Sequence, residues 1–279
     1  MPTHKINDVD LWYEDTGGAG EVILFHHGYT GSHDSWPPII EKLRDRYRCV
    51  MMDARGAGDS SHPADGYALD QYALDVIAMV DALGIDRFTY VGHSMGGGVG
   101  YVLGLDYGHR LNRLVLVAPV SSGGVAVLAA LRDANRKLWF DRNEDELVRQ
   151  RVVGAARPES VDEVRAKAGV SRALSVSEGH YEQSWQSMCE FNVTDRLGEI
   201  STPTLMIAAS ADSLIRANVS DYLLLPNATL HVFNRVGHLI PQDEPDQFAA
   251  VLGDFMAHGV VTAATLAERV ARPPKTNIG

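Results

Sequence analysis

A short glycine-rich stretch contains the residue best suited to act as a nucleophile. Gly92, Ser94 and Gly96 form the pattern Gly-x-Ser-x-Gly, which follows the apolar run 88–92 and precedes the small and apolar residues 97–105. The pattern is typical of a serine on a sharp strand-to-helix turn, because bulky residues two positions to either side would clash there. Such a turn places the hydroxyl beside a helix N-terminus, whose N–H groups can stabilise an oxyanion.

A serine hydroxyl needs a base before it can attack a carbonyl carbon at neutral pH. His238, in a loop after the last expected strand, is the candidate base. Asp212 follows the strand that ends near residue 209, and it is the candidate acid that orients the imidazole. Asp212 could instead cap the helix that begins near Leu214. The three residues Ser94, Asp212 and His238 together predict acyl transfer to water.

The oxyanion produced by this attack requires two backbone N–H donors. One is expected from Met95, the residue after the nucleophile. The other is expected from Tyr29, in the loop that follows the apolar run 21–26. Gly28 would let the backbone of that loop approach closely, and His27 is expected to bond to the loop and stabilise it.

These residues must be brought together by a sheet. Apolar and β-rich runs predict strands over residues 9–14, 21–26, 47–52, 88–92, 113–119, 204–209 and 229–233. Apolar residues at helical spacing predict helices over residues 36–45, 69–83, 99–105, 214–224 and 248–256. This alternation implies a parallel sheet covered on both faces, with ligands beyond the carboxyl ends of the strands.

The alternation stops between residues 121 and 197, which predict helices over 125–138, 144–153, 161–167 and 181–191. We therefore expect a core formed by 1–120 and 198–279 and a helical insertion at 121–197. The residues expected to contact substrate are His93, Trp139, Trp185, Met188 and Leu239. Three cationic residues near Trp139 could bind an anionic substrate, although a solvated helix face is the simpler interpretation. They are Arg132, Arg136 and Lys137.

Composition limits the kinds of partner. The 279 residues include 36 acidic and 25 basic side chains, and the formal charge of −11 argues against nucleic acid or an anionic membrane. The N-terminus lacks an apolar signal segment and no run of about 18 apolar residues exists, so we expect no membrane span and a cytoplasmic location. The two cysteines, Cys49 and Cys189, form no metal-binding pattern. The last residues, 272–279, are expected to fray.

The motifs together resemble those of the α/β-hydrolase superfamily. They are His27-Gly28, Asp53-x-Arg55-Gly56-x-Gly58-x-Ser60, Gly92-His93-Ser94-Met95-Gly96-Gly97, Asp212 and Gly237-His238. The resemblance is to cap-containing members with a serine nucleophile, among them esterases, lactonases and haloperoxidase-like proteins. It implies a mostly parallel eight-stranded sheet, helices on both faces, a helical cap and no cofactor or metal. It also implies that Ser94, Asp212 and His238 are catalytic and that Tyr29 and Met95 form the oxyanion hole.

The expected activity is hydrolysis of a small-molecule carboxylic ester or lactone through an acyl-enzyme. Serine at position 94 argues against dehalogenases and epoxide hydrolases of this superfamily, which use an aspartate.

Carbon–carbon bond hydrolases remain an alternative. Menaquinone-pathway lyases are another, because residues 27–32 and Trp36 are similar to a loop in some of those lyases. The lyase interpretation predicts an anionic ligand, so arginines facing Ser94 would favour it. A receptor-like binding protein with an intact triad is a third possibility. The oligomeric state is open.

Overall fold

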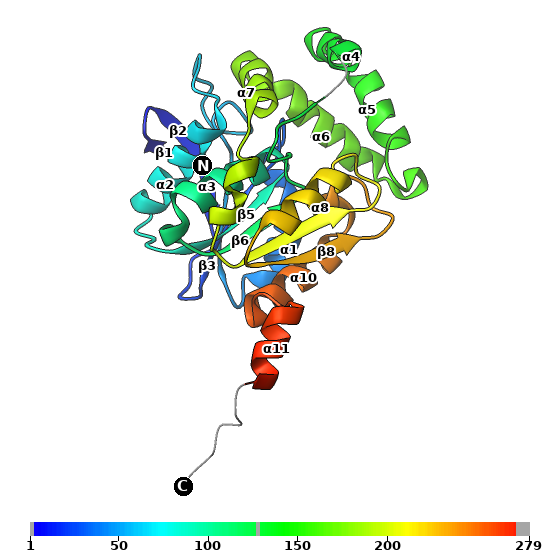
Figure 1. Ribbon diagram of the computed structural model, residues 1–279. Coiled ribbons are helices and arrows are strands. Elements are labelled where there is room, and N and C mark those ends of the chain that lie inside the picture. The colour runs from blue at the N-terminus through cyan, green and yellow to red at the C-terminus, as the bar shows by residue number, and fades with distance from the viewer. Residues whose placement is uncertain (1–2, 127–128, 272–279) are drawn as a thin grey trace.

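One eight-stranded sheet forms the centre of the molecule (Figure 1). The computed structural model describes residues 3–126 and 129–271. The expected frayed end, 272–279, and two residues of the helix expected at 125–138 therefore lie outside the described residues. The strands are β1 (Thr3–Ile6), β2 (Val9–Asp15), β3 (Val22–His26), β4 (Arg48–Met52), β5 (Phe88–His93), β6 (Leu111–Val117), β7 (Thr204–Ala209) and β8 (Ala228–Phe233).

The strand order is β1-β2-β4-β3-β5-β6-β7-β8. β2 is antiparallel to both β1 and β4, and every pairing from β4 to β8 is parallel. All six residues of β5 and of β7 are buried, as expected of strands that are covered on both faces. The α/β class and the mostly parallel sheet are thus confirmed. β1 was not predicted from the apolar runs, because only Ile6 of its four residues is buried.

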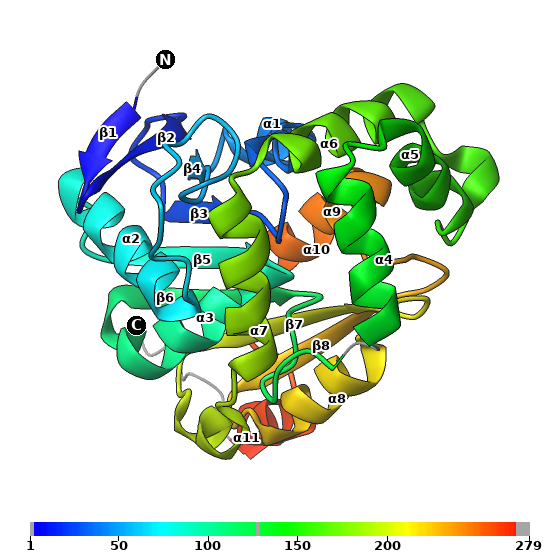
Figure 2. The same cartoon turned by 90° about the horizontal axis from the view of Figure 1, so that it is seen from above.

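Helices cover both faces of the sheet (Figure 2). On one face, α1 (Pro37–Leu43) and α10 (Pro245–His258) pack together over a core that includes Trp36 and Phe248. On the other face lie α2 (Leu69–Ala82), α3 (Met95–Asp106) and α8 (Ile215–Leu224). The N-terminus of α3 directly follows Ser94, so the packing of α3 on the sheet holds the β5–α3 turn in place.

Four helices between β6 and β7 lie over one end of the sheet (Figures 1 and 2). They are α4 (Ala129–Phe140), α5 (Glu144–Val153), α6 (Glu163–Ser175) and α7 (Trp185–Glu190). α6 extends well beyond the predicted helix at 161–167, and a π-helical turn at His180–Ser184 precedes α7. These helices correspond to the insertion expected at 121–197. Two further helices were not expected: the short α9 (Ile240–Asp243) and α11 (Ala263–Ala271).

One stretch near the C-terminus meets a length and composition test for a membrane span. In Pro245–Glu268, the most apolar window has a mean hydropathy of 1.4, and 28% of that window is buried. This differs from the expectation that the chain has no stretch of this kind. The stretch Pro245–Glu268 combines α10 with the beginning of α11, and Gly259 between these helices has a φ of 68°. α10 also contributes Phe248, Leu252 and Phe255 to the core, so length and composition are weak evidence here.

Candidate active site

Ser94 lies at the turn between β5 and α3 in a strained backbone conformation, with φ 54° and ψ −112°. A Cβ added to Gly92 would lie 2.1 Å from the carbonyl oxygen of Gly96. A Cβ added to Gly96 would lie 2.7 Å from the carbonyl oxygens of His26 and His27. The structure therefore gives a steric reason for glycine at both flanking positions.

The three predicted triad residues meet at the ends of the parallel strands. The Ser94 hydroxyl donates to His238 Nε2 across 2.8 Å, and His238 Nδ1 donates to Asp212 Oδ2 across 2.7 Å. Ser94 and Asp212 are 8% and 6% exposed, while the His238 side chain is about one-third exposed. This is the geometry in which an imidazole can accept a serine proton while a carboxylate fixes its tautomer.

Asp212 makes the contact expected of the triad acid and does not cap α8, whose N-cap residue is Leu214 and which has no side-chain cap hydrogen bond. Its Oδ2 accepts from His238, and its Oδ1 accepts from the backbone N–H of Leu214 at 3.1 Å, beside the beginning of α8. Burial tends to raise the pKa of Asp212, but the hydrogen bonds from His238 and Leu214 and the nearby His238 and His93 rings together lower it further. The net direction is a pKa below the ordinary value, so the carboxylate is ionised at neutral pH.

Two backbone N–H groups are available beside Ser94. Neither the Tyr29 nor the Met95 amide donates a hydrogen bond to an acceptor in residues 3–126 or 129–271. Met95 is the first residue of α3, so its N–H has no partner within the helix. The Tyr29 loop is closed by a bond from Gly31 N to Gly28 O at 2.9 Å. These two amides are the donors predicted for the oxyanion hole.

Buried histidines support the Tyr29 loop from two sides. His27 Nδ1 donates to Gly28 O at 2.8 Å, and His27 Nε2 accepts from Ala54 N at 3.0 Å, which is the structural role expected for it. His180 Nε2 accepts from Thr30 N at 3.4 Å. Burial and the nearby His27 lower the pKa of His180 to about 3, so the ring is neutral and can accept this bond. Sequence reasoning missed His180, because it lies outside the expected motifs.

Gly28 packs closely against the nucleophile, and this closeness leads to a testable expectation. A Cβ at position 28 would lie 3.0 Å from Ser94 Cβ and 3.2 Å from His93 Nδ1. Gly28→Ala is therefore expected to displace the Ser94 side chain and to lower kcat for ester hydrolysis about 10- to 100-fold. Steady-state kinetics with a short-chain ester, together with thermal unfolding, would check this. Unchanged kinetics would contradict the close packing.

His93, expected among the substrate contacts, also holds the loop of the candidate base. Its Nε2 donates to the backbone carbonyl of His238 at 2.9 Å, and the two rings lie 5.0 Å apart. Burial and the neighbouring His238 lower the pKa of His93 to about 3, so it is neutral. His93 therefore positions the His238 loop as well as lining the cavity beside Ser94.

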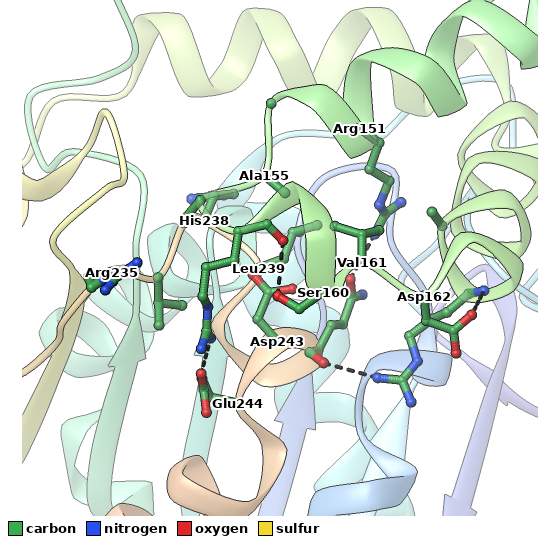
Figure 3. A pocket seen from close by; sticks show the side chains of 18 of the residues that line it. Arg151, Ala155, Ser160, Val161, Asp162, Arg235, His238, Leu239, Asp243 and Glu244 are labelled. Atoms are coloured by element: carbon green, nitrogen blue, oxygen red, sulfur yellow. Dashed lines mark hydrogen bonds and ion pairs between the residues drawn. The ribbon is translucent and has the colours of Figure 1, made fainter.

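Three neighbouring cavities lie under and beside helices α4 to α7, which together we call the cap. The first, of about 490 Å³, contains Ser94, His93, His238 and Leu239. The second, of about 320 Å³, is aromatic and is lined by Trp139 and Trp185 together with Tyr29, which also lines the first. The third, of about 600 Å³, shares His238 and Leu239 with the first (Figure 3). These volumes suit small-molecule ligands.

Met188 departs from the expected substrate contacts. It is 2% exposed, packs in the main apolar core and lines none of these three cavities.

Arg132 does not lie on a solvated helix face, so the simpler interpretation of this residue is wrong. Its guanidinium lies 4.5 Å from the ring centre of Tyr181 and 4.6 Å from that of Trp185, and it lines the aromatic cavity. Arg136 and Lys137 are largely exposed, as expected.

The cavity beside Ser94 is lined by guanidinium groups that sequence reasoning missed. Arg151 projects from α5, and Arg165 and Arg172 project from α6. Asp34 is the one carboxylate among the residues that line this cavity within the described chain, and it pairs with Arg172 at 2.9 Å. No pattern in the sequence relates these cap helices to Ser94, so the signal becomes visible only in the fold.

A cluster of possible metal ligands lies elsewhere at the strand ends. His33, Asp53 and Asp59 offer ligand atoms within 4.8 Å of one another. These groups are already bonded within the protein: Asp53 accepts from His33 Nδ1 at 2.7 Å and from Asp59 N at 2.9 Å. Asp59 also pairs with Arg172 at 2.9 Å. The cluster is thus explained as a network that holds the loops after β3 and β4.

Comparison with known proteins identifies the family of the fold. Residues 21–245 match the family model described as alpha/beta hydrolase fold. A putative carbamate hydrolase RutD from Variovorax paradoxus is 32% identical, over 88% of this chain and 96% of its own length. An N-formylmaleamate deformylase from Pseudomonas putida is 29% identical, over 91% of this chain and 96% of its own length.

A solved structure has the same overall fold. Est816, described as an N-acyl homoserine lactone degrading enzyme, superimposes with a TM-score of 0.78 at 26% identity, covering 91% of this chain and all of its own. The relatives and this structure support hydrolase activity for the chain.

Proposed function

Because the chain belongs to the α/β-hydrolase family, we propose that it cleaves a small carboxylic ester or lactone through an acyl-enzyme on Ser94. The observation that carries the proposal is the hydrogen-bonded series from Ser94 through His238 to Asp212, with bonds of 2.8 and 2.7 Å. This series gives the hydroxyl a base and gives the base a fixed tautomer. The free amides of Tyr29 and Met95 offer the charge stabilisation that acyl transfer requires.

The first half of the proposed reaction forms the acyl-enzyme. Ser94 Oγ attacks the carbonyl carbon as its proton passes to His238 Nε2. The carbonyl oxygen takes on negative charge between the Tyr29 and Met95 N–H groups. The bond to the leaving oxygen then breaks, and His238 gives its proton to that oxygen, which leaves as an alcohol.

The second half returns the enzyme to its starting state. His238 removes a proton from water, and the water oxygen attacks the acyl carbon. The same two amides hold the charge of the second tetrahedral intermediate. The intermediate then collapses, the acid departs and His238 returns the proton to Ser94. Substrate, water and protein groups account for every proton and electron pair, so the proposed reaction uses no cofactor.

A second candidate is a carbon–carbon bond hydrolase or a lyase that uses the same triad. The observation that favours the lyase is the set of guanidinium groups in the Ser94 cavity, because the lyase interpretation predicts an anionic ligand. The two candidates differ in the bond that breaks. They share the nucleophile, the base and the positively charged cavity.

Short-chain 4-nitrophenyl esters test the first candidate directly. We expect saturable release of nitrophenol, and a parallel series of lactones and carbon–carbon substrates would then rank the bond types. Turnover of the carbon–carbon substrates alone would move the assignment to the second candidate. Binding of esters without turnover would contradict the proposal and support a receptor-like role.

A further inference from the structure

Arg151 is a cation of the Ser94 cavity that forms no ion pair with a carboxylate in the described part of the chain. A guanidinium has five N–H donors. One of them, on Nη2, donates to Gln242 Oε1 at 2.7 Å, and no acceptor for the others is found in residues 3–126 or 129–271. Arg172 in the same cavity differs, because Asp34 and Asp59 each pair with it at 2.9 Å.

The position of Arg151 is built into the cap. The guanidinium lies against Gly169 of α6, where an added Cβ would be 2.5 Å from Nη1 and 2.9 Å from Cζ. A glycine inside a helix costs about 1 kcal/mol relative to alanine, and here it leaves room for the guanidinium. Gln242 fixes the other side, because its Nε2 donates to Ser35 Oγ at 2.9 Å while its Oε1 accepts from Arg151.

The charge of the cavity is opposite to that of the whole protein. The chain carries a formal charge of −11. The Ser94 cavity nevertheless has the guanidinium groups of Arg151, Arg165 and Arg172 against the single carboxylate of Asp34. Figure 3 shows the neighbouring cavity of about 600 Å³, which shares His238 with the Ser94 cavity. The Arg151 side chain projects into it from α5. Burial lowers the pKa of Arg151, and the charge of Asp243 acts against that shift.

We propose that Arg151 binds a carboxylate of the substrate, so that the preferred ester or lactone carries an ionised carboxyl group within reach of Ser94. The inference rests on the proposed function in that it takes Ser94 as the reacting group. A planar guanidinium with free N–H groups matches the two oxygens of a carboxylate and pairs with them strongly. The partly enclosed cavity strengthens this attraction relative to bulk water. The proposal applies to either bond type, because it concerns the binding of the substrate and not the bond that breaks.

Matched esters with and without a terminal carboxylate test the proposal. The pairs are monomethyl succinate with methyl butyrate, monomethyl glutarate with methyl pentanoate, and monomethyl adipate with methyl hexanoate. For the best pair, Arg151→Met is expected to lower the ratio of kcat/KM for the carboxylate ester to that for the neutral ester about 10- to 100-fold, chiefly through KM. Arg149→Met is the control, since Arg149 lies on the same helix, is exposed and pairs with Glu146.

A second variant and a binding measurement guard against misfolding. Gly169→Ala keeps the arginine but displaces its guanidinium, so it should lower the same ratio. Calorimetric binding of the preferred monomethyl ester to Ser94→Ala protein should weaken about 10- to 100-fold when Arg151→Met is added. An unchanged ratio and unchanged binding would overturn the proposal, as would an equal effect of Arg149→Met. Hydrolysis that persists in Ser94→Ala would instead refute the proposed function, so the two failures are distinguishable.

Discussion

Replacing Ser94 with alanine is expected to lower kcat for ester hydrolysis by a factor of about 10⁴ to 10⁶, which is the range for loss of a triad nucleophile. The reason is that His238 Nε2, 2.8 Å from Ser94 Oγ, would have no hydroxyl proton to accept. Alanine keeps the Cβ and the backbone of the turn, so the protein should fold normally. Kinetics with a short-chain 4-nitrophenyl ester and a circular dichroism spectrum would check both expectations.

Ser94→Gly is an informative companion to this variant. It also removes the hydroxyl, so it should be equally inactive. Because the native backbone at this position has a φ of 54°, glycine should relieve strain and raise the free energy of unfolding by about 1 kcal/mol. Denaturant unfolding of the three proteins would show it. An active Ser94→Gly protein would place the reacting group elsewhere.

Asp212→Asn is expected to lower kcat about 10⁴-fold while the fold is kept. The amide nitrogen of asparagine would face His238 Nδ1 as a donor, which favours the wrong tautomer of the imidazole. An asparagine oxygen can still accept from the Leu214 N–H, which Asp212 Oδ1 does at 3.1 Å, so the beginning of α8 should be unaffected. Steady-state kinetics would measure the loss.

Asp254→Asn provides the matched control for Asp212→Asn. Asp254 also faces a histidine, His258, at 3.8 Å, but both side chains are exposed on α10 and lie outside the described site. Its replacement should leave kcat within about twofold of the wild-type value, as is usual for a surface change. A loss of activity in Asp254→Asn as large as that in Asp212→Asn would argue against a specific role for Asp212.

The residues that could be predicted from the sequence are those fixed by local geometry. Gly92 and Gly96 are dictated by the backbone contacts of one tight turn, so the pattern alone locates Ser94. The buried strands are continuous apolar runs. Asp212 and His238 each follow the carboxyl end of a parallel strand, so both are expected at the same end of the sheet as Ser94. β1 escaped detection because three of its four residues are exposed and its pairing with β2 is long-range information.

The contents of the cavity could not be predicted for a different physical reason. Whether Arg151 or Arg149 faces Ser94 depends on how α5 is rotated against α6, and the hydrophobic pattern of α5 is too weak to fix that rotation, since none of its residues is buried. The same uncertainty affected Met188, which α7 presents to the core rather than to a cavity. Substrate recognition in this fold thus depends on helix packing that local patterns do not specify.

The most direct test of the account is to locate the acyl group during turnover. Wild-type protein would be mixed with a short-chain 4-nitrophenyl ester, quenched in acid within the first turnovers and mapped by peptide mass spectrometry. If Ser94 is the nucleophile, one acyl group per chain is expected on the peptide that contains Ser94, and none in Ser94→Ala. An acyl group on another residue, or undiminished hydrolysis by Ser94→Ala, would contradict this role of Ser94.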